Sequence, residues 1–373
     1  MNFELSEEQS ILKDTLERYL ADHYDFDTRC RALRGCAGPT LWPGLVEMGL
    51  TGAPFPLETG GHGGGPVEAM IVMEALGAAL ACEPWNEAIV LCGSLLAELG
   101  AQEHLAPLIE GSKRHALAHA ESGSSCGHAN VGCTAMPTRD GWQLDGTKAL
   151  SIGAGEADTL LVSARTDGSA GDEAGISLFA LPRATVGVTL HPMRMIDDRA
   201  CCDIELAAVR APASALVGPA GMAYPALERA HEAWLAALCS EAVGVVGRLH
   251  QDTVAYTRQR RQFGQPLSNF QVIQHRLVDM LMQVELATSA CHLATLSLDK
   301  PQPARRQALT AAALVTGEAL RFVGESAVQL HGAMGLTDEL AISHLFRRAT
   351  AIIQQLGSID QLSGACARAL RAA

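Results

Sequence analysis

The hydrophobic pattern of this chain changes twice along its length, and these changes limit the possible folds more than any single motif does. Apolar residues recur at helical spacing up to about residue 114 and again from Pro225. Short apolar runs separated by Gly, Asp and Pro stand between them, as in strands and turns; they lie at residues 142–146, 160–164, 176–180 and 188–190. We therefore predict a mainly α fold with a central β domain: an N-terminal helical domain (residues 1–114), a middle β domain (115–224) and a C-terminal helical domain (225–373).

The helical parts divide at recognisable start and stop signals. Ser6 and Gln9 have the spacing of a capping box that opens the first helix. Further N-terminal helices are predicted near residues 40–50, 66–79 and 87–111. In the C-terminal part, the apolar spacing predicts helices at residues 226–259, 269–298, 304–330 and 340–355, followed by a short tail helix. Helices joined by such short connections form a four-helix bundle.

The composition excludes several classes of function. The 373 residues carry a formal net charge of −13, which argues against a nucleic-acid partner. No run of about 18 apolar residues predicts a membrane span, and the chain does not start with the pattern of a secretory signal peptide. The 11 cysteines show no paired metal-ligand spacing. We therefore predict no metal site, and free thiols in a reducing cytoplasm.

Residues 256–280, with the sequence YTRQRRQFGQPLSNFQVIQHRLVDM, contain a polar bend between two predicted helices. Pro266 prevents the first helix from continuing, and the bend brings together Arg260, Phe263 and Gln271. A guanidinium binds phosphate through two parallel hydrogen bonds, a phenyl ring lies against a flat heterocycle, and an amide both donates and accepts. These side chains suit the diphosphate and adenine of a nucleotide. An ordinary basic helix end explains them equally well.

A second motif, QLHGAMGLTDE at residues 329–339, favours the nucleotide-binding interpretation over the ordinary helix end. The pattern Tyr-x-x-x-Arg-x-x-Phe-Gly with Gln seven residues after the Gly, and the pattern Gln-x-x-Gly-x-x-Gly-x-x-x-Glu, resemble the two signatures of the acyl-CoA dehydrogenase family. The resemblance extends over the whole chain. It implies that family's fold, FAD as the cofactor, and oxidation of the Cα–Cβ bond of an acyl-CoA substrate. It also implies that the matching residues reach across a dimer interface to the ADP end of a neighbour's flavin; these are Arg260, Phe263, Gln271, Gln329, Leu330, His331, Gly332 and Ala333.

The catalytic base that the resemblance implies is missing at both usual positions. Most family members place a Glu just before a Gly-Thr/Ser pair, and the matching residue here is Leu356. A minority place it 29 residues before the signature Phe, which gives Trp234. Neither side chain can accept a proton. Glu241 lies two helical turns beyond Trp234 and is a candidate for a displaced base; Glu232 is nearby, and ordinary helix carboxylates explain both.

The contacts to the flavin ring that the resemblance implies are altered as well. Ala120 replaces a Thr that would meet the ring, and Cys126 replaces a Ser near the substrate. Leu150 replaces a ring-packing Trp, and Ile152 replaces a hydrogen-bonding Thr. The matches are therefore confined to the residues for the ADP end of the cofactor.

The chain thus matches the family at the ADP end of the cofactor but not at the base or the flavin ring. In this it resembles the smaller subunit of heteromeric acyl-CoA dehydrogenases, such as those acting on pimeloyl-CoA or steroid side-chain CoA esters in fatty acid or steroid degradation. We predict a second acyl-CoA dehydrogenase subunit that holds the base and most of the flavin, in a dimer or tetramer. Two alternatives remain open. One is a self-sufficient homo-oligomeric dehydrogenase that uses Glu241, and the other is a structural paralogue that binds no flavin.

Overall fold

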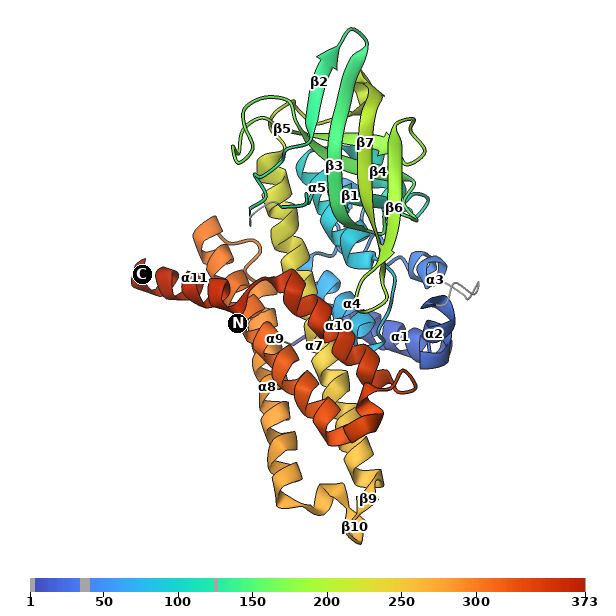
Figure 1. Cartoon of the computed structure of the whole chain (residues 1–373), viewed down its shortest axis with the longest axis vertical. Helices are drawn as coiled ribbons and strands as arrows, with labels where there is room; N and C mark the ends of the chain where they lie inside the picture. Colours follow the sequence, from blue (N-terminus) through green and yellow to red (C-terminus); the bar gives the residue numbers. More distant parts are fainter. Residues whose placement is uncertain (1–3, 34–40, 124–126, 373) are drawn as a thin grey trace. The chain divides into compact units, whose positions relative to one another are not determined.

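The computed structural model describes residues 4–33, 41–123 and 127–372, in two compact units. The helical unit comprises Met1–Leu41, Pro66–Cys82 and Leu235–Ala373, and the sheet unit comprises Trp42–Gly65 and Glu83–Trp234. Helices precede and follow a central sheet in chain order (Figure 1). The predicted mainly α fold with a central β domain is thereby confirmed. The domain boundaries after residues 114 and 224 stay predictions.

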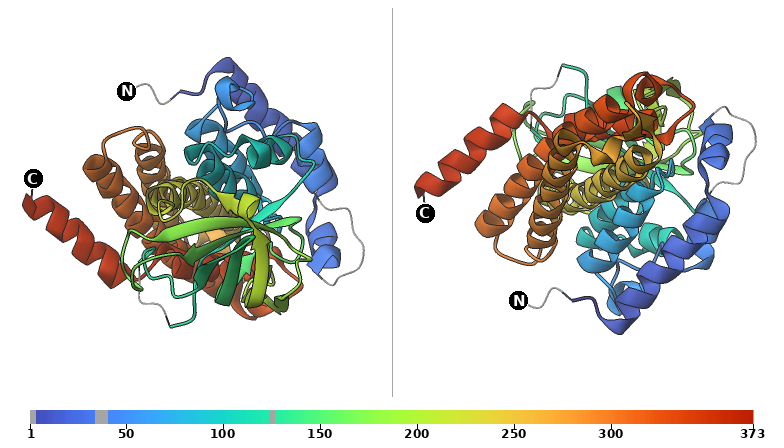
Figure 2. Two further views of the ribbon diagram at one scale, coloured as in Figure 1. Left: turned by 90° about the horizontal axis from the view of Figure 1, so that it is seen from above. Right: turned by 90° about the horizontal axis from the view of Figure 1, so that it is seen from below.

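The helical unit contains α1 (Glu7–His23), α2 (Phe26–Leu33), α4 (Pro66–Ala78), most of α7 (Tyr224–Gln259), α8 (Gln271–Thr295), α9 (Gln302–His331), α10 (Ala341–Leu356) and α11 (Ile359–Ala372). The capping box of α1 is present: the Gln9 N–H donates to Ser6 Oγ at 3.2 Å, and the Ser6 N–H donates to Gln9 Oε1 at 2.9 Å. Helix α9 packs against α8, α10 and α11, and α11 extends outward from these helices (Figure 2). Among the helices that the structure describes, none combines the length and apolar character needed to cross a membrane.

Helices α4 and α7 meet with their backbones in direct contact. A Cβ atom at Gly244 of α7 would overlap the carbonyl oxygen of Glu74, and one at Gly77 of α4 would overlap the carbonyl oxygen of Glu241. The missing side chains therefore permit the close approach. Glu241 stands at this crossing, so its backbone is fixed by packing against α4.

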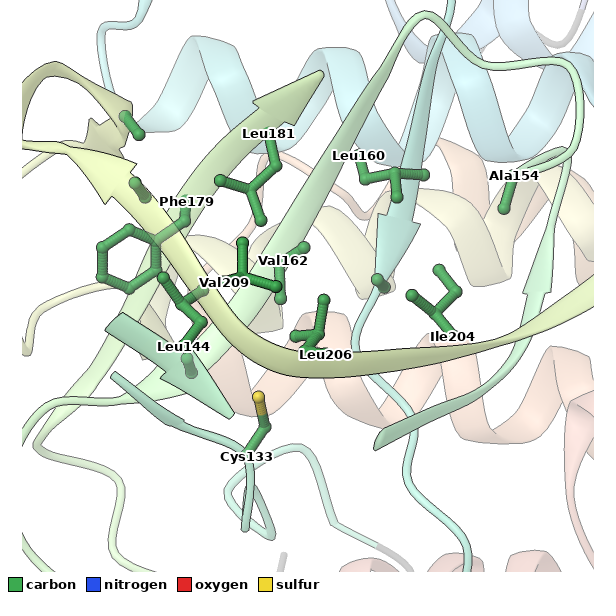
Figure 3. Close-up of a cluster of buried hydrophobic side chains, with 14 of the residues drawn as sticks. Cys133, Leu144, Ala154, Leu160, Val162, Phe179, Leu181, Ile204, Leu206 and Val209 are labelled. Atoms are coloured by element: carbon green, nitrogen blue, oxygen red, sulfur yellow. The ribbon is translucent and has the colours of Figure 1, made fainter. Parts of the chain in front are cut away.

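The sheet unit is built on eight strands: β1 (His115–Ala118), β2 (Thr134–Thr138), β3 (Gly141–Ile152), β4 (Thr159–Arg165), β5 (Ile176–Pro182), β6 (Val188–Arg194), β7 (Ala200–Pro212) and β8 (Leu216–Val217). Their order is β6-β7-β3-β2-β4-β5-β8, and β1 pairs parallel with β4. The side chains of Val162, Phe179, Leu206 and Val209 form part of its buried core (Figure 3). The short helices α3 (Trp42–Glu47), α5 (Ser94–Glu98) and α6 (Gln102–Ile109) belong to the same unit.

Several elements differ from the sequence prediction. The predicted helix at 87–111 is three helices, a π-helix at Asn86–Gly93 followed by α5 and α6. Gly100, at φ 65°, separates the last two, because glycine adopts this left-handed conformation at little cost. The prediction missed α2 and the strands β1, β2, β7 and β8. Strand β7 begins with Ala-Cys-Cys, which are not strong strand formers, and it is stabilised by pairing with β3 and β6.

Candidate functional site

The bend after α7 is a tight β-hairpin. Strands β9 (Arg261–Gln262) and β10 (Gln265–Pro266) pair antiparallel at the end of α7 (Figure 1). Phe263 and Gly264 form the turn, at φ 52° and 81°. A two-residue hairpin turn with both central residues at positive φ matches the twist of its strands. A phenylalanine in this conformation is strained, and its ring is 89% exposed. The hairpin thus presents the Phe263 ring to the outside.

Three polar side chains that the sequence assigned to a nucleotide lie before the hairpin (Arg260), after it (Gln271) and near the end of α9 (Gln329). Arg260, Gln271 and Gln329 are exposed, and none of their side chains has a hydrogen bond or ion pair to another residue in the described ranges. The Leu267 N–H donates to the Arg260 carbonyl at 2.9 Å, which closes the hairpin against the helix end. The backbone is therefore anchored while the polar side chains remain available to a ligand or to another chain.

The second motif lies beside the first. The Tyr256 ring stacks on the His331 ring, with centroids 4.2 Å apart and an interplanar angle of 25°. The Tyr256 hydroxyl donates to the His331 carbonyl at 3.4 Å, and His331 Nδ1 donates to the Ala327 carbonyl at 2.8 Å. Burial lowers the pKa of His331, so the imidazole is neutral near pH 7. The structure therefore brings the two motifs together through His331.

A short 3-10 helix, Gly332–Leu336, follows α9 directly. Gly332 has φ 62°, and a Cβ atom there would meet no other atom within 4 Å. Gly332 and Ala333 are exposed, whereas Leu330 is half-buried. The requirement for glycine at position 332 is thus conformational, and the exposed backbone at the start of this helix is accessible from outside.

The two usual positions for a base carry no acid. Leu356 is buried at the end of α10 and lies beside α9, where a Cβ atom on Gly317 would be 3.8 Å from Leu356 Cδ1. Trp234 lies on α7 in the sheet unit, and its Nε1 has no hydrogen-bond partner among the residues described. Glu232, in the sheet unit too, lies with one carboxylate oxygen 3.7 Å from Arg229.

Glu241 is engaged in a buried ion pair. Arg348 Nε donates to Glu241 Oε1 at 2.6 Å, and Arg348 Nη2 donates to Oε2 at 2.7 Å. Glu241 is 4% exposed and Arg348 is 2% exposed. A carboxylate held at both oxygens by one guanidinium is stabilised in its charged form and does not readily take up a proton. This pairing argues against the hypothesis that Glu241 is a displaced base, and that hypothesis remains untested.

Polar residues next to the positions implied for the flavin ring form a structural network. Lys148 Nζ is buried and donates to Glu121 Oε1 at 2.6 Å and to Ser163 Oγ at 3.1 Å. Glu121 also accepts from the N–H groups of Gly132 and Cys133, at 2.7 and 2.9 Å. Glu121 therefore fastens the segment before β2 to β3.

Positions 120, 150 and 152 offer no polar side-chain group in this region. Leu150 is 58% exposed at φ 52°, where the ladder between β3 and β7 shifts register, and its N–H donates to Asp203 Oδ1 at 2.9 Å. Ile152 pairs with Cys201 of β7, and the Ala120 carbonyl accepts from the Ala149 N–H at 2.8 Å. Cys126 lies outside the described residues.

Sequence reasoning missed three features of these surroundings: the Glu241–Arg348 pair, the Lys148–Glu121 network and a group of three histidines in the sheet unit. Each joins residues far apart in the sequence. The available signal for the second was the position of Glu121 and Lys148 beside Ala120 and Leu150, two residues that the sequence had already compared with the family's flavin-ring contacts.

Comparisons with known proteins agree on one family. Family models described as "Acyl-CoA dehydrogenase" match its N-terminal domain to residues 6–110, its middle domain to 116–209 and its C-terminal domain to 226–369. The probable acyl-CoA dehydrogenase YngJ of Bacillus subtilis (strain 168) is 28% identical over 362 residues, with 94% of each chain covered. The short-chain specific acyl-CoA dehydrogenase of Megasphaera elsdenii is 29% identical over 321 residues, with 82% of each chain covered.

Solved structures give the same result. A variant of the steroid ACAD Tcur3481-Tcur3483 is 27% identical, with a TM-score of 0.84 and 98% of each chain covered. Butyryl-CoA dehydrogenase from Megasphaera elsdenii is 25% identical, with a TM-score of 0.89, 99% of this chain and 100% of that chain covered. Since the three domain models match in order over most of its length, the chain belongs to the acyl-CoA dehydrogenase family.

Proposed function

We propose that this chain is one subunit of a heteromeric acyl-CoA dehydrogenase and that it lends the ADP-binding surface for an FAD held mainly by a partner subunit. The observation that carries the proposal is an asymmetry between two sets of residues. The side chains of Arg260, Gln271 and Gln329 are exposed and have no hydrogen-bond or ion-pair partner in the part of the chain that the structure describes. The base positions, by contrast, hold Leu356 and Trp234.

The exposed surface fits the ADP end of FAD. The Arg260 guanidinium can bind the diphosphate through two hydrogen bonds, and the Phe263 ring can lie against adenine. Gln271 and Gln329 supply amides that donate and accept. The exposed turn at Gly332 and Ala333 offers backbone groups without a large side chain in front of them. FAD, the cofactor of this family, would supply the acceptor for a hydride from the β carbon of the acyl group.

The sheet unit does not fit the ring end of FAD in the same way. Ala120 and Ile152 carry no hydroxyl, and Leu150 carries no indole, so these positions provide no side-chain hydrogen bond to a flavin ring. Glu121 and Lys148, which lie close to these positions in the sequence, are bonded to each other within the protein. We infer that a partner subunit supplies the ring contacts and the base.

The substrate that follows from this proposal is an acyl-CoA thioester. The similarity to the Tcur3481-Tcur3483 steroid ACAD supports a steroid side-chain ester as the first substrate to examine. Butyryl-CoA, after the Megasphaera elsdenii enzyme, is the matching short-chain comparison.

Purification of the chain alone and together with a candidate partner dehydrogenase tests the proposal. The isolated chain should lack bound FAD and should not oxidise an acyl-CoA, since a general base contributes roughly 10²–10⁴-fold to the rate. The complex should contain one FAD for each pair of unlike chains and should turn over. Stoichiometric FAD and turnover in the isolated chain would instead support the self-sufficient enzyme. A stable complex without FAD would support the structural paralogue.

A further inference from the structure

Three histidines from separate segments meet inside the sheet unit. His119 directly follows β1, His128 lies between β1 and β2, and His231 lies near the start of α7. One ring nitrogen from each lies within 4.8 Å of the other two. The ring centroids are 5.8 Å apart for His119 and His128, 5.4 Å for His119 and His231, and 3.9 Å for His128 and His231. These residues are not among the positions discussed for the flavin or the base.

Hydrogen bonds orient two of the rings. His231 Nδ1 lies 2.8 Å from the Leu227 carbonyl, which only accepts, so Nδ1 carries the proton and Nε2 carries a lone pair. His119 Nδ1 lies 2.9 Å from Ser163 Oγ, and Ser163 Oγ accepts from Lys148 at 3.1 Å. A hydroxyl oxygen has two lone pairs and can accept from both. Histidines that bind metals have this arrangement, in which one ring nitrogen is hydrogen-bonded and the other faces the ion.

The one cation described beside these rings is already balanced by an anion. The Lys148 ammonium, which approaches His119, is neutralised by its ion pair with Glu121 at 2.6 Å.

We propose that His119, His128 and His231 bind a divalent transition metal ion such as Zn²⁺. Imidazole ligands suit Zn²⁺, and three histidines leave a fourth tetrahedral position for water. With Zn–N bonds of about 2.0–2.1 Å, the centres of two such rings are roughly 5 Å apart. Both pairs that include His119 are close to this separation, at 5.4 and 5.8 Å. His128 lies outside the helices and strands and must move by about 1 Å from His231.

Metal binding to the tag-free, chelator-treated chain is the test. Calorimetric titration with Zn²⁺ should give one ion per chain, and Co²⁺ should give the visible absorption of a tetrahedral complex. His119→Ala and His231→Ala should each abolish both signals. Ser163→Ala should weaken Zn²⁺ binding roughly 10–100-fold, since it removes the hydrogen bond that orients His119.

His104→Ala is the matched control. His104 and His115 form another close ring pair in the sheet unit, at 6.1 Å, and replacing His104 leaves the three-histidine cluster intact. This variant should bind Zn²⁺ like the unsubstituted chain. Absence of one-per-chain binding to the unsubstituted chain would overturn the proposal whether or not the variants fold. Equal binding by a folded His231→Ala variant would do the same. Neither measurement needs FAD, substrate or a partner subunit, so the outcome is separate from that of the proposed function.

Discussion

The Arg348 guanidinium holds both oxygens of the Glu241 carboxylate, at 2.6 and 2.7 Å, between α10 and α7. Glu241→Gln leaves the guanidinium buried without its counter-charge. We expect this change to lower the free energy of unfolding by about 3–5 kcal/mol. Urea denaturation of the isolated chain measures the loss.

The double replacement Glu241→Met with Arg348→Met distinguishes a contribution of Glu241 to stability from a role in catalysis. Replacing both members of a buried ion pair by apolar residues of similar size is often close to neutral, so the double variant should regain most of the stability. Its complex with the partner subunit should retain turnover. A stable double variant whose complex is inactive, while FAD content is unchanged, would point to a chemical role for Glu241.

Because α4 and α7 cross closely, we expect glycines of α7 to differ sharply in how well they tolerate replacement by alanine. Gly244→Ala places a methyl group against the Glu74 carbonyl, and we expect it to destabilise the chain by about 1–3 kcal/mol or more. Gly247→Ala, one turn further along α7, meets no atom within 4 Å. It should be neutral or stabilise the chain by up to about 1 kcal/mol, since alanine favours helix. Thermal unfolding of the two variants, side by side, checks the difference.

Arg260→Ala should weaken FAD retention by the heteromeric complex by about 1.5–3 kcal/mol, the range for a hydrogen bond to a charged group. The folding of the isolated chain should not change, because the Arg260 side chain has no protein partner among the residues that the structure describes. Arg321→Ala, which removes another exposed arginine from α9, is the control. Equal FAD content in both complexes across a dilution series would contradict the assignment of Arg260.

The lowered pKa of His344 predicts that the folded chain loses stability as the pH decreases. Burial, followed by the nearby Arg29 guanidinium, lowers its pKa from 6.5, while Asp338 acts in the opposite direction and Arg347 adds to the lowering. Arg29 Nη1 donates to His344 Nδ1 at 2.6 Å, which requires the neutral ring. Below pH 6.5 the unfolded chain therefore binds more protons than the folded one, and stability falls as pH decreases toward the lowered folded pKa.

His344→Gln keeps an acceptor for Arg29 and removes the titration. It should reduce the slope of stability against pH below 6.5 by up to about 1.4 kcal/mol per pH unit. His275→Gln, which makes the same substitution at an exposed histidine of α8, is the control. Denaturation series between pH 5 and 8 give the slopes; identical slopes for all three proteins would refute the role of His344.

Regular elements with a strong apolar period were predictable from the sequence. The helix predicted at 226–259 is α7, Tyr224–Gln259, and the bend predicted at 263–266 is the hairpin turn. The positive φ of Phe263 was not predictable, because the local preferences of phenylalanine oppose it. It results from the hairpin as a whole, in which Gly264 and the pairing of Gln262 with Gln265 determine the turn.

Side-chain partners distant in sequence were the least predictable part of the site. Glu241 and Arg348 are 107 residues apart, and only the packing of α7 and α10 brings them together. Spacing along one helix makes Glu241 a candidate base, but it cannot show that the carboxylate is already paired with Arg348. The histidine cluster was hidden for the same reason, since His119 and His231 meet only after the sheet has formed.

The stacking of Tyr256 on His331 joins the two family motifs directly. Binding usually costs conformational entropy when it draws separate segments into register. Here the ring contact at 4.2 Å and the hydrogen bond from the Tyr256 hydroxyl to the His331 carbonyl at 3.4 Å fix the end of α7 against the end of α9 beforehand. The bond from His331 Nδ1 to the Ala327 carbonyl, within α9, orients the imidazole. A molecule that spans both motifs therefore binds a preorganised surface. Its affinity is not reduced by the conformational entropy that ordering the two motifs would otherwise cost.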